Sequence, residues 1–66
     1  MTLEEYKNEI KEILIKDYKR SETQATNLIN HNTKDIEMLY EDEIRLSPNE
    51  VARVLSFIIY EEAYKK

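Results

Sequence analysis

The sequence predicts an all-α fold: a small three-helix bundle, or four short helices if the middle helix breaks near Asn32. Three observations support this. Apolar residues recur at steps of three and four, the spacing of one buried helical face. Three helix-start motifs divide the chain, and no stretch alternates with the period of two that is typical of a strand. We expect residues 1–66 to form one helical domain, because the chain is too short for a second one.

The first helix is predicted from about Leu3 to about Lys19. Thr2 and Glu5 form a capping box, in which the threonine hydroxyl accepts from a backbone N–H and the glutamate reaches back to the cap. Behind this motif the apolar residues share one face of the helix, namely Leu3, Tyr6, Ile10, Ile13 and Leu14. This helix should therefore bury a single apolar stripe.

The middle region runs from about Glu22 to about Glu43 and opens with a second capping box at Ser21 and Gln24. Two apolar triplets, Ala25-Leu28-Ile29 and Ile36-Leu39-Tyr40, are offset by eleven residues, which is almost three helical turns. This phase match favours one continuous helix. The stretch Asn30-His31-Asn32-Thr33 is made of poor helix formers and supports the alternative, in which Asn32 or Thr33 caps a new helix.

The last helix is predicted to start at Ser47-Pro48-Asn49-Glu50, with Ser47 as the cap and Pro48 at the first helical position. Its broad apolar face holds Val51, Ala52, Val54, Leu55, Ile58, Ile59 and Ala63. A second stripe, Phe57, Tyr60 and Tyr64, recurs at steps of three and four. A helix this apolar is either central in the bundle or also meets another chain.

The composition excludes several classes of site. The chain has no glycine and no cysteine, which excludes phosphate-binding glycine loops, disulfide scaffolds and thiol nucleophiles. Without glycine, the helices also lack the usual left-handed glycine stop, so their ends are less clearly marked than their starts. The start of the chain does not resemble a signal peptide and no apolar run is long enough to span a membrane, so we expect a cytoplasmic protein.

Catalytic residues are scarce. The single histidine, His31, is expected to face solvent and has no partners at a known metal-ligand spacing. Ser21 and Ser47 are explained by capping, and Ser56 has no neighbouring base. We therefore expect no enzyme activity, no catalytic residue, no cofactor and no metal.

The net charge of −4 is concentrated in one region. Positions 35–50 hold six acidic residues, and Arg45 is the only basic residue among them. Three of these acids, Glu37, Glu41 and Asp42, are expected to form an exposed acidic patch, which is either a solvated face or a docking surface for a basic partner. This charge disfavours direct nucleic-acid binding.

The aromatic stripe Phe57, Tyr60 and Tyr64 has two interpretations. It could pack against the first helix near Ile15 and Tyr18. It could also be an interface, because aromatic residues are enriched at the centres of protein contacts. A two-fold homodimer through this stripe would complete an otherwise small core.

Part of the chain resembles a known group of proteins. The motifs Leu39-Tyr40-Glu41-Asp42 and Ser47-Pro48-Asn49-Glu50-Val51-Ala52 resemble those of small uncharacterised helical proteins from phages and mobile elements of low-GC Gram-positive bacteria. The resemblance implies a genomic setting and no activity.

Together these observations predict a non-enzymatic helical protein-interaction module that self-associates through its C-terminal helix. Its partner would be a protein or a second copy, rather than nucleic acid or a membrane. The alternative prediction is an acidic inhibitor or decoy that binds the basic surface of a nucleic-acid-binding partner.

Overall fold

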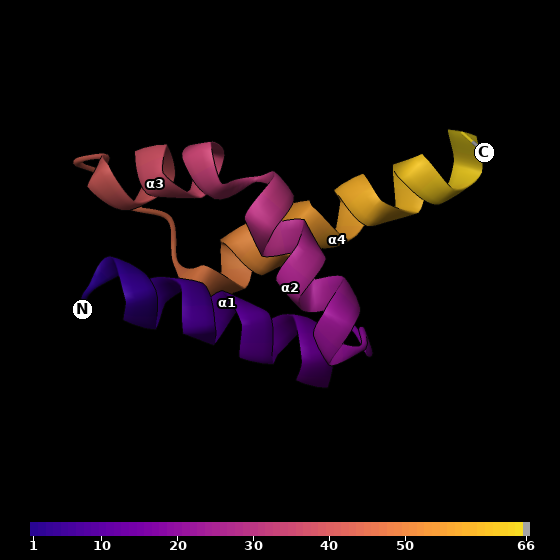
Figure 1. Ribbon diagram of the computed structural model, residues 1–66. Coiled ribbons are helices and arrows are strands. Elements are labelled where there is room, and N and C mark those ends of the chain that lie inside the picture. Colours follow the sequence, from indigo (N-terminus) through magenta and orange to yellow (C-terminus); the bar gives the residue numbers. More distant parts are fainter. Residues whose placement is uncertain (66) are drawn as a thin grey trace.

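The computed structural model is all-α and describes the backbone of residues 1–65 and the side chains of residues 1–57. Its helices are α1 (Leu3–Lys16), α2 (Glu22–His31), α3 (Thr33–Glu41) and α4 (Pro48–Lys65). No strand occurs within residues 1–65. α1 contacts each of the other three helices, and its largest contact is with α4 (Figure 1). The predicted fold class, a small helical bundle, is confirmed.

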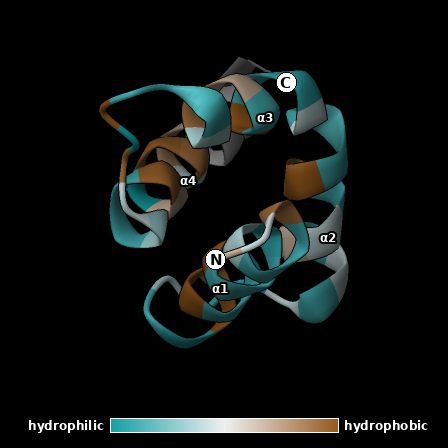
Figure 2. Ribbon diagram, turned by 90° about the vertical axis from the view of Figure 1, so that its left-hand side faces the viewer, coloured by the Kyte–Doolittle hydropathy of each residue, from teal (hydrophilic) through white to brown (hydrophobic). Residues whose placement is uncertain are grey.

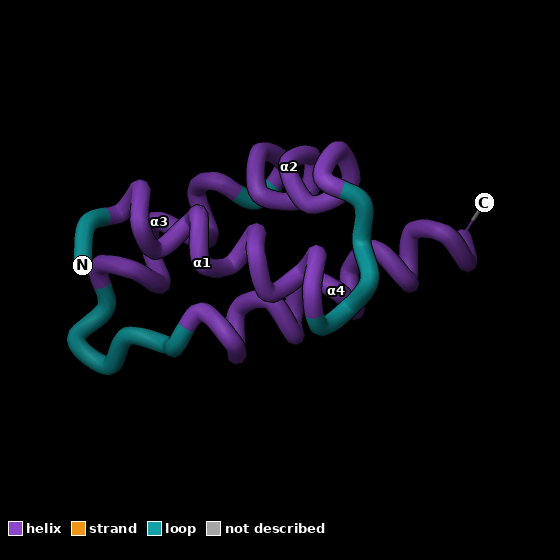
Figure 3. Tube along the Cα trace, turned by 90° about the horizontal axis from the view of Figure 1, so that it is seen from below, coloured by secondary structure: helices purple, strands orange, loops and turns teal. Residues whose placement is uncertain are grey.

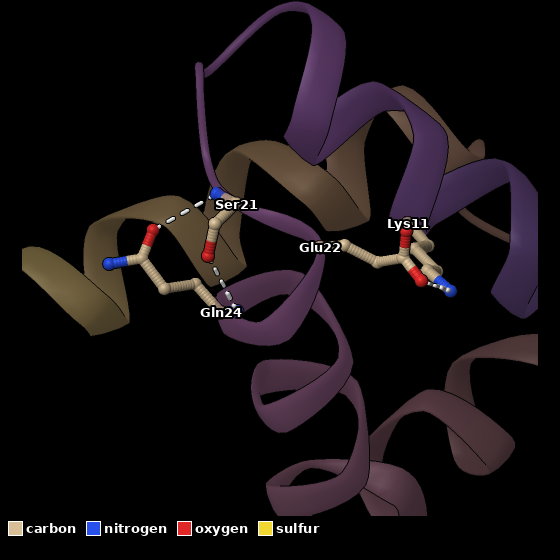
Figure 4. A network of polar contacts seen from close by, with 4 residues as sticks. All are labelled: Lys11, Ser21, Glu22 and Gln24. Carbon is tan, nitrogen blue, oxygen red and sulfur yellow. Dashed lines mark hydrogen bonds and ion pairs between the residues drawn. The ribbon is translucent and has the colours of Figure 1, made fainter.

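The predicted helix starts are confirmed in atomic detail. Thr2 Oγ1 accepts a hydrogen bond from the Glu5 N–H at 3.1 Å, and the Thr2 N–H donates to Glu5 Oε1 at 2.8 Å. Ser21 and Gln24 exchange the same pair of bonds at the start of α2 (Figure 4). At the start of α4, Ser47 Oγ accepts from the Glu50 N–H at 3.3 Å. Hydrogen bonds from Thr2 hold the pKa of the Glu5 carboxyl below its ordinary value.

The middle helix is broken, so the prediction that favoured a continuous helix is wrong. Asn32 separates α2 from α3, with φ −115° and ψ 23°, outside the helical range. Its side-chain Nδ2 donates to the Leu28 carbonyl at 2.8 Å, and Thr33 Oγ1 donates to the Ile29 carbonyl at 3.0 Å. The Leu28 and Ile29 carbonyls also accept from the Asn32 N–H, so these short polar side chains add second bonds at the end of α2.

The core lies where α1 crosses α4 and is covered by α2 and α3. Figure 2 shows hydrophobic stretches on α1, α2 and α4. The buried apolar residues are Tyr6, Ile10, Leu14, Ala25, Leu28, Ile29, Ile36, Val51, Ala52 and Leu55. Leu3 and Ile13, also predicted to lie on the buried face of the first helix, are half-buried.

A tyrosine cluster, made of Tyr6, Tyr40 and Arg45, joins α1, α3 and the α3–α4 connection. The two tyrosine rings lie 5.3 Å apart, and the Arg45 guanidinium lies 4.0 Å from the centre of the Tyr40 ring. Tyr6 Oη donates to the Leu46 carbonyl at 2.7 Å, and Tyr40 Oη donates to the Met1 carbonyl. Burial raises the pKa of the Tyr6 hydroxyl. Each polar tip in the cluster therefore reaches a backbone carbonyl or a ring, and the cluster fixes the start of α1.

Candidate functional site

A hollow of about 360 Å³ lies between the α1–α2 turn and the middle of α4. Its walls are Tyr18 and Arg20 from the turn and Arg53, Ser56 and Phe57 from α4. Figure 3 shows the turn lying beside α4, with the C-terminal part of α4 continuing past it. The hollow therefore combines two segments that are far apart in the sequence.

The turn is shaped by a lysine in a left-handed backbone conformation. α1 ends at Lys16, earlier than the predicted end near Lys19, and Lys19 has a φ of 56°. The chain then reverses, and the Arg20 N–H donates to the Leu14 carbonyl at 3.0 Å. In the absence of glycine, Lys19 adopts this left-handed conformation itself, at an energetic cost.

The hollow carries two cations without described counter-ions. Within the described side chains the single ion pair joins Lys11 to Glu22 at 3.8 Å (Figure 4), so neither Arg20 nor Arg53 is paired there. Arg20 is half-buried and its Nε atom is buried without a hydrogen-bond acceptor. An unsatisfied buried donor is uncommon in a folded protein and calls for an explanation.

Ser56 lines the hollow but supplies no free hydrogen-bond donor to it. Its side chain is only 8% exposed, and its hydroxyl donates to the Arg53 carbonyl at 2.7 Å within α4. The hydroxyl proton is therefore already used. The donors available in the hollow come from the two guanidinium groups, and the Tyr18 and Phe57 rings supply apolar wall.

An exposed apolar flank, Val54 and Phe57, lies on α4. These side chains are 53% and 59% exposed, whereas Val51, Ala52 and Leu55 are buried. The predicted broad apolar face of the last helix is therefore only partly buried within the chain, and Val54 lies on its exposed part. The side chains of Ile58, Ile59, Tyr60, Ala63 and Tyr64 lie outside the described residues.

The aromatic stripe is described only at Phe57. Its first interpretation, packing near Ile15 and Tyr18, stays a prediction, since at Phe57 the structure shows only that it lines the same hollow as Tyr18. Phe57 nevertheless keeps more than half of its surface exposed. Tyr60 and Tyr64, the rest of the predicted interface, cannot be placed from the described side chains.

The predicted acidic patch is less regular than expected. Glu41 and Asp42 are exposed, whereas Glu37 is half-buried. Asp42 is not on a helix face, because α3 ends at Glu41 and Asp42 is extended, with ψ 145°. Its Oδ1 accepts from the Ile44 N–H at 3.1 Å, so part of its charge organises the local turn.

Other features of the described chain give no further site. His31 is exposed, as expected. No group of three or more histidine, cysteine, aspartate or glutamate residues in the described part of the chain could hold a metal ion. None of the helices, as far as the structure describes them, combines the length and the apolar character needed to cross a membrane.

No protein-family model, no curated protein and no solved structure matches the chain. The resemblance to small phage and mobile-element proteins therefore stays a prediction. Function is therefore inferred from the geometry of the hollow and of α4.

Proposed function

We propose that this protein is a non-enzymatic interaction module that binds a second copy of itself through α4. We keep the cytoplasmic location predicted from the sequence as part of this proposal. The observation that carries the proposal is the exposed apolar flank at Val54 and Phe57, on a helix whose C-terminal part runs beyond the other three helices (Figures 1 and 3).

The sequence beyond this flank continues the same character. Positions 58–64 contain five apolar or aromatic residues and two glutamates. A helix that is surrounded by solvent usually has a more polar composition. Positions 54–64 span about 16 Å of helix, at about 1.5 Å per residue. Two such segments could pair about a two-fold axis, so that the same apolar patch of each chain covers that of the other.

The size of this surface predicts a weak dimer. A segment of about 16 Å is well short of a standard interface of about 800 Å² per partner. We therefore expect dissociation between about 1 μM and about 1 mM, or about 4 to 8 kcal/mol of association free energy. The small core of each chain gives self-association a stabilising role as well.

Sedimentation velocity over this concentration range tests the proposal. The wild-type protein should shift from monomer to dimer. Val54→Ser and Phe57→Ser should each move the midpoint to higher concentration, because each removes apolar contact area. Met38→Ser is the matched control, since Met38 is 69% exposed on α3, away from the flank. A protein that stays monomeric at the highest concentration would rule the proposal out.

A sequence-based variant extends this test. Tyr60→Ser combined with Tyr64→Ser should weaken the dimer at least as much as Phe57→Ser, if the predicted stripe continues the flank. An unchanged midpoint in this double variant would confine the interface to Val54 and Phe57.

The alternative function, an acidic decoy for a basic partner, stays a prediction outside this proposal. Its patch loses regularity at Glu37 and Asp42, and no described feature near it points to a ligand. Replacing Glu37 and Glu41 with lysine and measuring binding to a basic bait protein would test it separately.

A further inference from the structure

The hollow between the α1–α2 turn and α4 has the features of a binding site for a small acid. Two arginines, Arg20 and Arg53, line it, and neither is paired with an acid within the described side chains. Guanidinium groups bind carboxylates through paired N–H donors, which makes arginine the side chain best suited to a planar acid group.

Arg20 provides a second, independent indication. Its Nε–H is buried and has no acceptor in the described structure, although buried donors normally have one. This Nε atom is itself inaccessible, so a carboxylate in the hollow would be bound through the terminal nitrogens of the guanidinium, which are not buried donors of this kind. The Ser56 hydroxyl already donates its proton to the Arg53 carbonyl, so it is not a free donor for a bound acid.

The walls and the volume indicate what the acid should be attached to. Tyr18 and Phe57 line the hollow with aromatic rings. An inorganic anion would make no apolar contact with these rings, whereas an acid attached to a ring would. The volume of about 360 Å³ is near the lower limit of small-molecule pockets, which span roughly 300–1,000 Å³. A single ring bearing one carboxylate fits this size.

We propose that the hollow binds a small aromatic carboxylate, with Arg20 and Arg53 on the acid group and Tyr18 and Phe57 against the ring. This site lies within one chain but shares Phe57 with the proposed self-association surface, so binding is measured in dilute solution, where the chain is monomeric.

Benzoate is a suitable probe, and ¹⁵N-labelled protein observed by two-dimensional NMR is the readout. Benzoate should cause saturable amide shifts at Tyr18, Arg20, Ser56 and Phe57. Benzyl alcohol keeps the ring without the charge, and acetate keeps the charge without the ring. Each should bind at least about tenfold more weakly, because each lacks one half of the recognition.

Arg20→Gln and Arg53→Gln should each weaken benzoate binding by about tenfold, since each removes a charge-assisted contact. Lys34→Gln is the matched control, because it removes an exposed positive charge from α3, which does not line the hollow. Arg53 is exposed, so its variant remains informative even where Arg20→Gln disturbs the turn. Helical circular dichroism checks the fold of every variant.

Val54→Ser separates this site from self-association, because Val54 does not line the hollow. In dilute solution, where both proteins are monomeric, benzoate should bind this variant and the wild type alike. The proposal is overturned if benzoate gives no saturable shifts, if benzyl alcohol binds equally well, or if Lys34→Gln loses as much affinity as Arg53→Gln.

Discussion

The tyrosine cluster and the hollow each place arginine near tyrosine, yet the arginines differ in how many contacts their guanidinium groups make. In the cluster, Arg45 stacks on Tyr40 and its Nε donates to the Tyr40 carbonyl at 2.6 Å. In the hollow, Arg20 lies near Tyr18 and Phe57 with a buried Nε that has no acceptor. The cluster therefore serves stability, whereas the groups in the hollow remain available for a ligand.

The largest expected effect comes from removing an aromatic ring on each side of this comparison. Tyr6→Ala should lower the free energy of unfolding by about 3–5 kcal/mol, because Tyr6 is fully buried and leaves a cavity. Phe57→Ala should change it by less than about 0.5 kcal/mol in dilute solution, where no second copy covers the ring. Urea denaturation followed by circular dichroism measures both. Equal losses would contradict the distinction between the two regions.

A smaller effect isolates the Tyr6 hydroxyl. Tyr6→Phe should cost about 1 kcal/mol, because it removes the hydrogen bond to the Leu46 carbonyl.

The raised pKa of Tyr6 adds a pH dependence. Above the ordinary tyrosine pKa of 10.0 the unfolded chain releases this proton first, so wild-type stability should fall as pH rises past that value. Urea titrations from about pH 8 to about pH 11, a range that brackets that pKa, should show a shallower fall in Tyr6→Phe. Parallel curves for the two proteins would contradict this role of burial.

The two arginine environments can be compared directly. Arg45→Ala should cost about 0.5–1 kcal/mol, because it removes the contact with the Tyr40 ring. Arg53→Ala should stay within about 0.5 kcal/mol, because Arg53 is exposed and has no described counter-ion. Thermal unfolding at one protein concentration distinguishes them, and a larger loss in Arg53→Ala would reverse the comparison.

The smallest effect is a gain at the turn that builds the hollow. Lys19→Gly should raise the free energy of unfolding by roughly 0.5 kcal/mol, because glycine adopts a positive φ without the Cβ penalty. Lys16→Gly, at the last residue of α1, should give no gain and serves as the control. A loss of stability in Lys19→Gly would show that the lysine side chain matters more than its backbone.

Helix starts could be predicted from the sequence because their signals are local. The reciprocal bonds of Thr2 with Glu5 and of Ser21 with Gln24 need only four consecutive residues. The break at Asn32 could not be decided in this way. The apolar phase on both sides is compatible with a continuous helix, and side-chain bonds to the carbonyl four residues earlier, like those of Asn32 and Thr33, also occur within helices.

The hollow was not predicted, and the reason is again the turn. Only part of its aromatic wall could be anticipated, from the expectation that Phe57 lies near Tyr18. Arg20 joins it because Lys19 adopts a conformation that sequence patterns assign to glycine or asparagine. Arg53 was visible only as a lone positive charge on the last helix. An arginine directly before a helix cap, together with a second arginine on another helix, is the pattern that could have suggested the site.

The break at Asn32 also has a consequence for local opening. α3 contributes one fully buried side chain, Ile36, and its junction with α2 is closed by short polar side chains rather than apolar packing. A segment with so little buried surface can open before the rest of the protein unfolds. Amide hydrogen exchange should therefore be faster throughout α3 than in the buried turns of α1. The tyrosine cluster is the contact that opposes this opening, because Tyr40 joins α3 to Tyr6 of α1.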